Sequence, residues 1–489
     1  VGAAASGALD EAFVGPRLDL SERPGPALRR AFQELESGNF VLAAERFDAI
    51  EAAFPIVADH AAEGHLRALH AAGDPAAARA AAQAFAAAHA DSVLFAGVLA
   101  LEGELAASAR EEGAARKAWR RAQKRASGPS RRAELEAKIA ASYERSGRTA
   151  KAIESYRKLW TRHAARPEGK LADAALDRLQ AAGHGRLRSA RNWIDRGDAL
   201  YKARDNEGAL AAFDHALARG LRSDVGKDVR WKRARTLFRL RRYPEATRAF
   251  SAMGKGVEAR FWRARALARS GEIARSVAAF EAVAKGRTTP LALRARYLAA
   301  TLLQGEGQVQ RAKRHFSAVA QSSSGLRFDA RWRLGWLAYL EEDYATAGGQ
   351  FEKLAAADPD PVGALRPRYW MAKVRIAEGD PRGEEALAAI ARDFPFTYYG
   401  WRAGTALATE SLERPAQAFP ESAPSKMNLR ALTRARILLE AGRPEAAARE
   451  VRQAARPGLS LDDRVVAAGL LTAAQKIHRA QRAVANGYA

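Results

Sequence analysis

Two histidines and a glutamate lie close together near the start of the chain, in the order His60-Ala-Ala-Glu63-Gly-His65. Residues of these types can bind zinc, most often from a pair of histidines four residues apart on one helix face. Here the histidines are five residues apart, which separates them by about 500° around a helix, so they do not share a face. We therefore expect no metal site here and predict a solvated helix surface.

Lysine and arginine gather in two short stretches that could bind an anion. Residues 110–133 hold nine of them against two glutamates, and residues 227–242 hold eight against one aspartate. In the first stretch, a helix would stack two neighbouring stripes of cations, namely Arg116, Arg120 and Lys124, and Lys117, Arg121 and Arg125. We interpret these six residues as contacts to an anionic polymer, with an ordinary solvated helix face as the open alternative.

The remaining composition excludes several kinds of chemistry. The chain has no cysteine, which rules out disulfides and thiolate metal sites. Neither the glycine pair at 348–349 nor Gly305 with Gly307 forms a phosphate-binding loop, and no strand–turn–helix context exists for a nucleophile elbow. We therefore assign no catalytic residue, no metal and no cofactor. The formal net charge of +24 favours a polyanionic partner, although a genomic arginine habit would give the same composition.

A recurring spacing of small and aromatic residues indicates the elements that carry these side chains. A glycine is followed after five residues by a small residue, after four more by an aromatic one and after three more by an apolar one. The copies are Gly38-Ala43-Phe47-Ile50, Gly147-Ala152-Tyr156-Leu159, Gly271-Ser276-Phe280-Val283 and Gly307-Ala312-Phe316-Val319. The glycine suits the end of one helix, and the other three positions share one face of the next helix.

The preceding helix of each pair is marked by an aromatic residue. These residues are Tyr201, Trp231, Trp262, Tyr297, Trp332 and Trp370, at steps of 30, 31, 35, 35 and 38 residues. A period near 34 residues is typical of tetratricopeptide repeats, which are helix–turn–helix units. The sequence therefore predicts an all-α superhelical solenoid of tetratricopeptide-like helix pairs.

Three regions follow from where this rhythm holds. Residues 1–24 lack it, and we expect an extended arm there; residues 25–407 form the superhelical domain. Residues 408–489 begin with a proline-rich linker and end in a small helical subdomain. No apolar run approaches the length of a membrane span. Because the first residue is valine and the first seven residues are small and uncharged, we expect a signal peptide to have been removed.

One segment outside the repeat resembles a known family. Residues 394–403 (FPFTYYGWRA) resemble the Pro-x-Ser/Thr-Tyr-Tyr-Gly segment of soluble lytic murein transglycosylases, through Pro395, Tyr398, Tyr399 and Gly400. Residues 330–339 (ARWRLGWLAY), 368–372 (RYWMA) and 196–201 (RGDALY) resemble the tryptophan-rich repeats of that family. The resemblance covers residues 190–489 well and the first third of the chain only as generic repeats.

The resemblance implies a superhelix that closes into a ring with a linker subdomain, in a periplasmic protein that can associate with the outer membrane. The family's separate catalytic domain cleaves peptidoglycan to a 1,6-anhydroMurNAc product, using a glutamate in a Glu-Ser dipeptide that precedes a Gly-Leu-Met-Gln motif. Glu410-Ser411 and Glu421-Ser422 lie in the proline-rich linker, and the second motif is absent. The resemblance therefore implies a scaffold region without the catalytic domain, which we expect to be inactive alone.

In this interpretation the partners are peptidoglycan glycan strands and cell-wall synthesis proteins, and the Tyr-Tyr-Gly segment is structural. Two alternatives remain open. The first is a free-standing tetratricopeptide adaptor that holds peptides or subunits. The second is a basic nucleic-acid-binding array, which is disfavoured because the aromatic residues sit at helix-core positions rather than as exposed stacking platforms.

Overall fold

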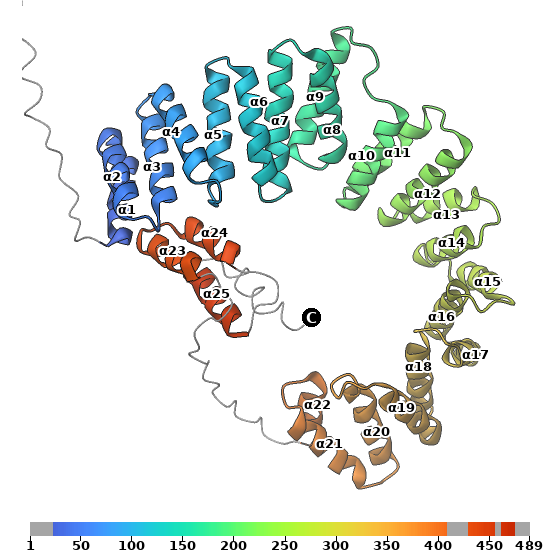
Figure 1. Cartoon of the computed structure of the whole chain (residues 1–489). Coiled ribbons are helices and arrows are strands. Elements are labelled where there is room, and N and C mark those ends of the chain that lie inside the picture. Colours follow the sequence, from blue (N-terminus) through green and yellow to red (C-terminus); the bar gives the residue numbers. More distant parts are fainter. Residues whose placement is uncertain (1–22, 408–428, 455–460, 475–489) are drawn as a thin grey trace, which may run out of the picture. The chain divides into compact units, whose positions relative to one another are not determined.

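The fold is entirely helical in the computed structural model, which describes residues 23–407, 429–454 and 461–474. These residues form 25 helices and no strand (Figure 1). They divide into two compact units, of which unit 1 comprises residues 1–187 and 418–489 and unit 2 comprises residues 188–417. Among the described residues, no helix is long and apolar enough to cross a membrane.

Unit 1 combines helices from both ends of the chain. Its helices are α1 (Pro24–Glu36), α2 (Phe40–Ala53), α3 (Ala58–Ala71), α4 (Pro75–Ala88), α5 (Phe95–Ser108), α6 (Glu112–Arg125), α7 (Pro129–Arg145), α8 (Thr149–Arg162), α9 (Pro167–Ala181), α23 (Leu429–Glu440), α24 (Pro444–Ala454) and α25 (Leu461–Ala473). Helix α23 packs against α1, and Ile437 and Ala441 join the apolar core that α1, α2 and α3 form.

Unit 2 is one continuous row of helix pairs. Its helices are α10 (Ala190–Lys202), α11 (Asn206–Leu217), α12 (Ser223–Arg239), α13 (Tyr243–Ser251), α14 (Val257–Arg269), α15 (Ile273–Ala284), α16 (Pro290–Gly305), α17 (Val309–Ala320), α18 (Arg327–Leu340), α19 (Tyr344–Ala357), α20 (Leu365–Ala377), α21 (Arg382–Asp393) and α22 (Tyr398–Ala406). Figure 1 shows the second helices α13, α15 and α17 on the outer side of the curve that this row follows.

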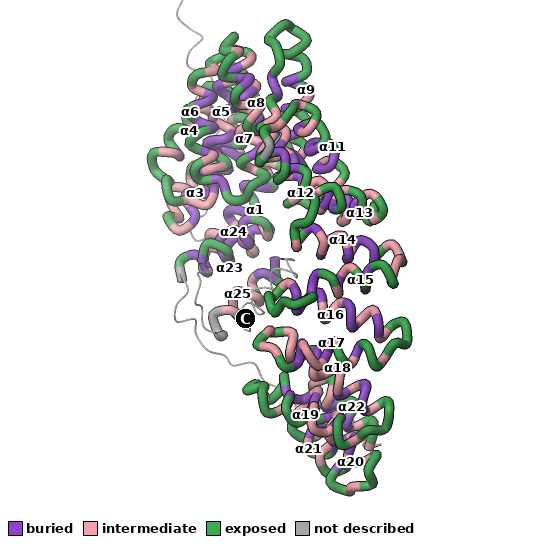
Figure 2. Tube along the Cα trace, turned by 90° about the vertical axis from the view of Figure 1, so that its right-hand side faces the viewer, coloured by how far each residue is buried: buried purple, intermediate pink, exposed green. Residues whose placement is uncertain are grey.

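The predicted repeat register matches the helices. Each predicted glycine ends a first helix with positive φ, for example 82° at Gly271 and 72° at Gly307. The aromatic residue of each second helix, such as Phe280 or Phe316, is almost completely buried. Figure 2 shows these buried positions recurring from helix to helix, as expected when each unit contacts only its neighbours.

Two of the helix pairs that are missing from the copies seen in the sequence depart from the pattern at one position. In α4 the aromatic residue is Phe85, one turn later than expected, and the preceding turn residue is Gly73 with φ of 83°. In α6 the aromatic residue is the buried Trp119, but the turn residue is Arg110, which takes the left-handed conformation without glycine.

The predicted boundaries at 24 and 407 stay predictions. Most of the expected arm (1–24) and all of the expected linker (408–427) lie outside the described residues. Residues 418–489 group with the first third of the chain rather than forming a compact unit of their own. Closure of the superhelix into a ring is likewise still a prediction.

Candidate functional site

His60, the first histidine of the motif near the start of the chain, lies in the interior of unit 1. The side chain of His60 is buried, and its Nε2 atom is 2.9 Å from Oε1 of Glu450, a residue 390 positions further along the chain. The prediction of a solvated helix surface is therefore wrong for His60. The reason is that Glu450 of α24 contacts this face of α3, and no local pattern in the sequence predicts a contact between residues so far apart.

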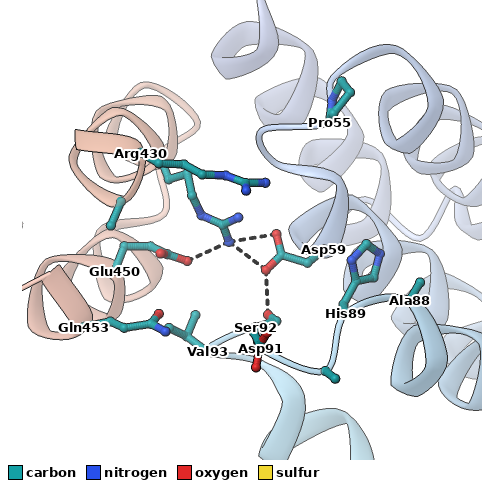
Figure 3. A pocket seen from close by; sticks show the side chains of 13 residues that line it. Pro55, Asp59, Ala88, His89, Asp91, Ser92, Val93, Arg430, Glu450 and Gln453 are labelled. Atoms are coloured by element: carbon teal, nitrogen blue, oxygen red, sulfur yellow. Dashed lines mark hydrogen bonds and ion pairs between the residues drawn. The ribbon is translucent and has the colours of Figure 1, made fainter. Parts of the chain in front are cut away.

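A guanidinium completes this buried cluster, which we call the Asp59 centre (Asp59, His60, Arg434 and Glu450). Nη2 of Arg434 lies 2.8 and 2.6 Å from the two carboxylate oxygens of Asp59 and 2.8 Å from Oε1 of Glu450 (Figure 3). Ser92 donates a further hydrogen bond to Asp59 at 2.5 Å. The centre therefore joins α3, the loop before α5, α23 and α24.

Electrostatics make the Asp59 centre a structural ion pair rather than a metal site. The possible ligand atoms of Asp59, His60 and Glu450 lie within 4.8 Å of one another, but the Arg434 guanidinium already supplies the positive charge that a metal would bring. Burial raises the pKa of Asp59, yet the charge of His60 and the hydrogen bonds from Arg434 and Ser92 outweigh it and hold the pKa below its usual value. A carboxyl group so held is ionised at neutral pH and does not suit general-acid catalysis.

The basic stripe predicted at residues 116–125 lies on α6, and one of its members is not available to a ligand. Arg116 is buried, and its Nη1 atom donates to the carbonyl and hydroxyl oxygens of Ser142 and to the hydroxyl of Ser146. Burial lowers the pKa of Arg116, and the charge of Arg148 lowers it further. Its inclusion in the predicted stripe is therefore corrected: this arginine holds α6 to α7.

The other five cations of the stripe are exposed. Arg121 and Arg125 lie over the ring of Phe95, and Arg120 bonds to the hydroxyl of Tyr143. These three arginines thus have partners within the chain that fix their positions. Binding of an anionic polymer by this face stays a prediction.

The Tyr-Tyr-Gly segment forms the start of α22. Thr397 caps the helix by accepting a hydrogen bond from the backbone N–H of Gly400 at 3.0 Å. Gly400 is buried so close to the chain before it that a Cβ atom there would lie 1.8 Å from the carbonyl oxygen of Phe394. Pro395 lies in the turn that precedes this cap. The glycine therefore permits α22 to follow α21 closely.

The two tyrosines of this segment differ from each other. Tyr399 is half-buried and packs against Tyr369, with ring centroids 5.5 Å apart. Tyr398 is 59% exposed, so the packed environment predicted for both tyrosines holds for only one of them. Their neighbour Trp401 is 63% exposed, and the sequence analysis did not single it out.

Unit 2 also carries a row of arginines, which we call the arginine row (Arg235 of α12, Arg265 of α14 and Arg294 of α16). The guanidinium carbon atoms of Arg235 and Arg265 lie 3.9 and 4.3 Å from the centre of the Trp262 ring system. Among the described residues, none of the three arginines is ion-paired with a carboxylate. The row thus consists of two cations held by Trp262 and a third, Arg294, on the next repeat, and no carboxylate in the described part of the chain neutralises them.

The arginines of the row lie close enough together to affect one another's ionisation. Burial lowers the pKa of Arg265, and the positive charges of Arg294, Arg235 and Arg269 lower it further. Guanidinium groups placed together in this way are suited to an oxyanion, because each can donate two parallel hydrogen bonds.

Part of the arginine row was visible in the sequence. Arg235 belongs to the basic stretch 227–242, but its contact with Trp262 crosses from one repeat to the next. The signal that could have found Arg235 and Arg265 is an arginine three or four residues after the aromatic residue of a first helix, as in Trp231 with Arg235 and Trp262 with Arg265, whereas Arg294 lies three residues before Tyr297.

Comparison with known proteins identifies the class of fold. The tetratricopeptide repeat family matches residues 194–255 and 297–361, and a second tetratricopeptide repeat family matches residues 138–165. These matches cover less than half of the chain. No curated protein matches the sequence. Repeated helix pairs without strands, among the described residues, define an all-α tetratricopeptide-like superhelix.

Solved structures of the 70-kDa soluble lytic transglycosylase share this fold. One, in complex with bulgecin A, has a TM-score of 0.50 at 14% identity, over 94% of this chain and 70% of that one. The enzyme SLT70 from Escherichia coli gives a TM-score of 0.50 at 12% identity, over 92% and 70%. The tetratricopeptide domain of P58(IPK) covers 95% of this chain, but with a TM-score of only 0.22 at 12% identity. The similarity to the lytic transglycosylases is thus one of superhelical fold.

Proposed function

We propose that this chain is the superhelical, substrate-positioning region of a periplasmic lytic transglycosylase, an enzyme that cleaves peptidoglycan between MurNAc and GlcNAc to give 1,6-anhydroMurNAc. Three findings support the proposal: the shared superhelical fold, the Pro395–Gly400 segment and the net charge of +24. The observation that carries it is the arginine row. In this function the chain binds glycan strands and presents them to a catalytic domain, and it contributes no catalytic residue.

The arginine row is chemically matched to peptidoglycan. The stem peptides of that polymer carry carboxylates, and a lactyl group carries one where its peptide has been removed. A carboxylate accepts paired hydrogen bonds from a guanidinium. Because Arg235 and Arg265 already rest on Trp262, little side-chain entropy remains to be lost when a carboxylate binds. The row also crosses three successive repeats, so it can follow an extended polymer.

Sedimentation with purified sacculi tests this function. The double variant Arg265→Gln, Arg294→Gln should bind sacculi about a hundredfold more weakly at low salt, since two charge-assisted contacts of about 1.4 kcal/mol each are lost. Raising the salt to about 1 M should weaken the wild type as well, because the Debye length falls to about 3 Å.

A matched control separates a built site from bulk charge. Arg191 and Arg392 also lie in unit 2, but they are exposed and paired with Asp195 and Asp393 at 3.0 and 2.9 Å. The double variant Arg191→Gln, Arg392→Gln removes the same charge and should retain wild-type binding. Equal losses in the two double variants would contradict a specific role for the arginine row. Tight binding to duplex DNA without binding to sacculi would instead favour the nucleic-acid alternative.

The second candidate function is a tetratricopeptide adaptor that holds a peptide or a protein subunit. The family matches at 138–165, 194–255 and 297–361 favour it. An adaptor would bind sacculi at low salt only through its bulk charge, so the two double variants would lose binding equally, and it would retain a defined protein partner when the salt is raised. Periplasmic location follows only from the first function and can be checked by fractionation of cells that express the parent protein.

A further inference from the structure

A hollow at the C-terminal end of unit 2 combines exposed rings with cationic groups. Its volume is about 550 Å³, and the residues that line it come from helices α18, α20 and α22. The residues that line this pocket, which we call the aromatic pocket, are Tyr339, Tyr369, Trp370, Lys373, Tyr398, Trp401, Arg402, Thr405 and Ala406. All of these residues are described, and none belongs to the arginine row.

Two large rings in the aromatic pocket face solvent. Tyr398 and Trp401 are more than half exposed, and their ring centroids are 6.3 Å apart at an interplanar angle of 43°. Beneath them, Tyr369 packs against both Trp370 and Tyr399, with centroid distances of 5.7 and 5.5 Å. Exposed aromatic groups beside a hollow are typical of ligand-binding surfaces, since burying them would otherwise stabilise the fold.

The polar groups of the aromatic pocket are held in place beside these rings. Nη1 of Arg402 donates to the hydroxyl of Tyr398 at 3.2 Å, and its guanidinium carbon lies 5.6 Å from the Tyr369 ring centre. Lys373 adds an ammonium group on α20, and the hydroxyl of Thr405 donates to the carbonyl oxygen of Trp401 at 2.9 Å. The pocket therefore offers apolar faces and hydrogen-bond donors side by side.

We propose that the aromatic pocket is a saccharide-binding subsite, which stacks the C–H face of a pyranose ring on Tyr398 or Trp401. Its ligand is a neutral β-linked chain of N-acetylated hexosamines, an identification that rests on the proposed function. The hydroxyl and acetamido oxygens at the rim of each sugar accept hydrogen bonds from Arg402 and Lys373. The pocket thus binds the sugar backbone, whereas the arginine row binds the acidic groups attached to it.

The chemistry of the pocket favours a saccharide over two other ligands that stack on aromatic residues. A proline-rich peptide docks on aromatic grooves through apolar ridges and offers few acceptors to two neighbouring cations. Single-stranded nucleic acid is bound by successive platforms along a basic groove, but the large exposed rings in the described part of the chain are Phe396, Tyr398 and Trp401, which all lie at or just before the start of α22 and form no such series. A pyranose ring matches both features, since it has an apolar face and an oxygen on nearly every carbon.

Calorimetric titration of the full chain with chitotetraose tests the proposal. Wild-type protein should bind this uncharged tetrasaccharide, and Trp401→Ala should weaken binding at least tenfold. Tyr398→Phe should weaken it less than Tyr398→Ala, because the ring remains and only the hydroxyl that holds Arg402 is lost. Phe396→Ala is the matched control: this residue is 72% exposed and lies two positions from Tyr398, but it does not line the pocket.

The outcomes separate this proposal from the proposed function. Sedimentation with sacculi without any binding of chitotetraose overturns the saccharide subsite and leaves glycan binding through the arginine row intact. Binding of chitotetraose that Trp401→Ala removes, without sedimentation of the wild type, supports the subsite and overturns the proposed function. Equal losses in Phe396→Ala and Trp401→Ala overturn the subsite. So does tighter binding of a proline-rich peptide or of oligothymidylate at the same pocket.

Discussion

At the scale of single residues, Gly400 is the clearest case of a side chain excluded by its surroundings. It lies in the first turn of α22 against the carbonyl oxygen of Phe394. The same arrangement occurs at Gly169 in the first turn of α9, where a Cβ atom would lie 2.3 Å from the carbonyl oxygen of His163. In both places a helix begins directly over the last turn of the preceding helix, and only a residue without a side chain fits.

We therefore expect Gly400→Ala to lower the free energy of unfolding by about 2–4 kcal/mol, as other overpacking changes against rigid backbone do. The control is Gly349→Ala on α19, where nothing lies within 4 Å of the added atom. That change should raise stability by up to about 1 kcal/mol, because alanine favours a helix interior. Denaturant unfolding of both variants measures the contrast. Equal changes in the free energy of unfolding would show that the backbone near Phe394 moves to make room for the added Cβ atom.

At this scale, the sequence does not predict whether a residue at the border of the buried helix face is itself buried. Ala115, Trp119 and Ala122 define the buried side of α6, and Arg116 lies only about 100° around the helix from Ala115. Whether such a border residue is buried depends on its partner, which here is Ser142 on the next helix. Tyr398 and Tyr399 differ in burial for the same reason, since only Tyr399 packs against Tyr369.

At the scale of helices and turns, the repeat was predictable because one backbone requirement recurs. The residue between the two helices of each pair takes a left-handed conformation, with glycine at Gly147 and Gly271 but arginine at Arg204 and Arg241. This conformation costs a non-glycine residue roughly 1–2 kcal/mol of free energy. The helix-packing face therefore fixes the turn geometry even where its preferred residue is missing.

This strain gives a test of the repeat. Replacing the exposed Arg241 by glycine should raise the free energy of unfolding by about 0.5–1 kcal/mol, since relief of strain exceeds the added chain entropy. The reciprocal change, Gly271→Ala, should lower it by about 1 kcal/mol. Thermal unfolding followed by circular dichroism measures both. A loss of stability in Arg241→Gly would mean that the arginine side chain makes a stabilising contact.

At the scale of the whole molecule, local periodicity predicted the all-α repeat but not the grouping of its parts. Unit 1 unites residues that are hundreds of positions apart, through the contact of α1 with α23 and through the Asp59 centre. A pattern with a period near 34 residues carries no information about such a contact. The aromatic pocket was missed for a related reason: its rings come from three helices, and only three of its nine residues lie in residues 394–403.

Acid should act on unit 1 through the Asp59 centre. The folded-state pKa of Asp59 is lowered, so its contribution is fully present above the unfolded pKa of about 3.9 and is lost as the pH falls through the folded value. The wild-type melting temperature should therefore drop below about pH 4. The variant Asp59→Asn should have a lower melting temperature than the wild type at neutral pH. Its melting temperature should also change less as the pH falls below about 4. If the melting temperatures of the wild type and of Asp59→Asn change with pH in the same way, this account is contradicted.

The two-part composition of unit 1 also has a consequence for synthesis of the protein on the ribosome. Asp59 is added to the chain 375 residues before its partner Arg434. At a typical rate of about 5–20 residues per second, that interval lasts roughly 20–75 seconds. During this time the carboxylate of Asp59 has no guanidinium to neutralise it, and α3 lacks its cover. The first helices of the nascent chain therefore stay incomplete until α23 and α24 have been made, and the face of α3 that carries Asp59 and His60 is exposed until then.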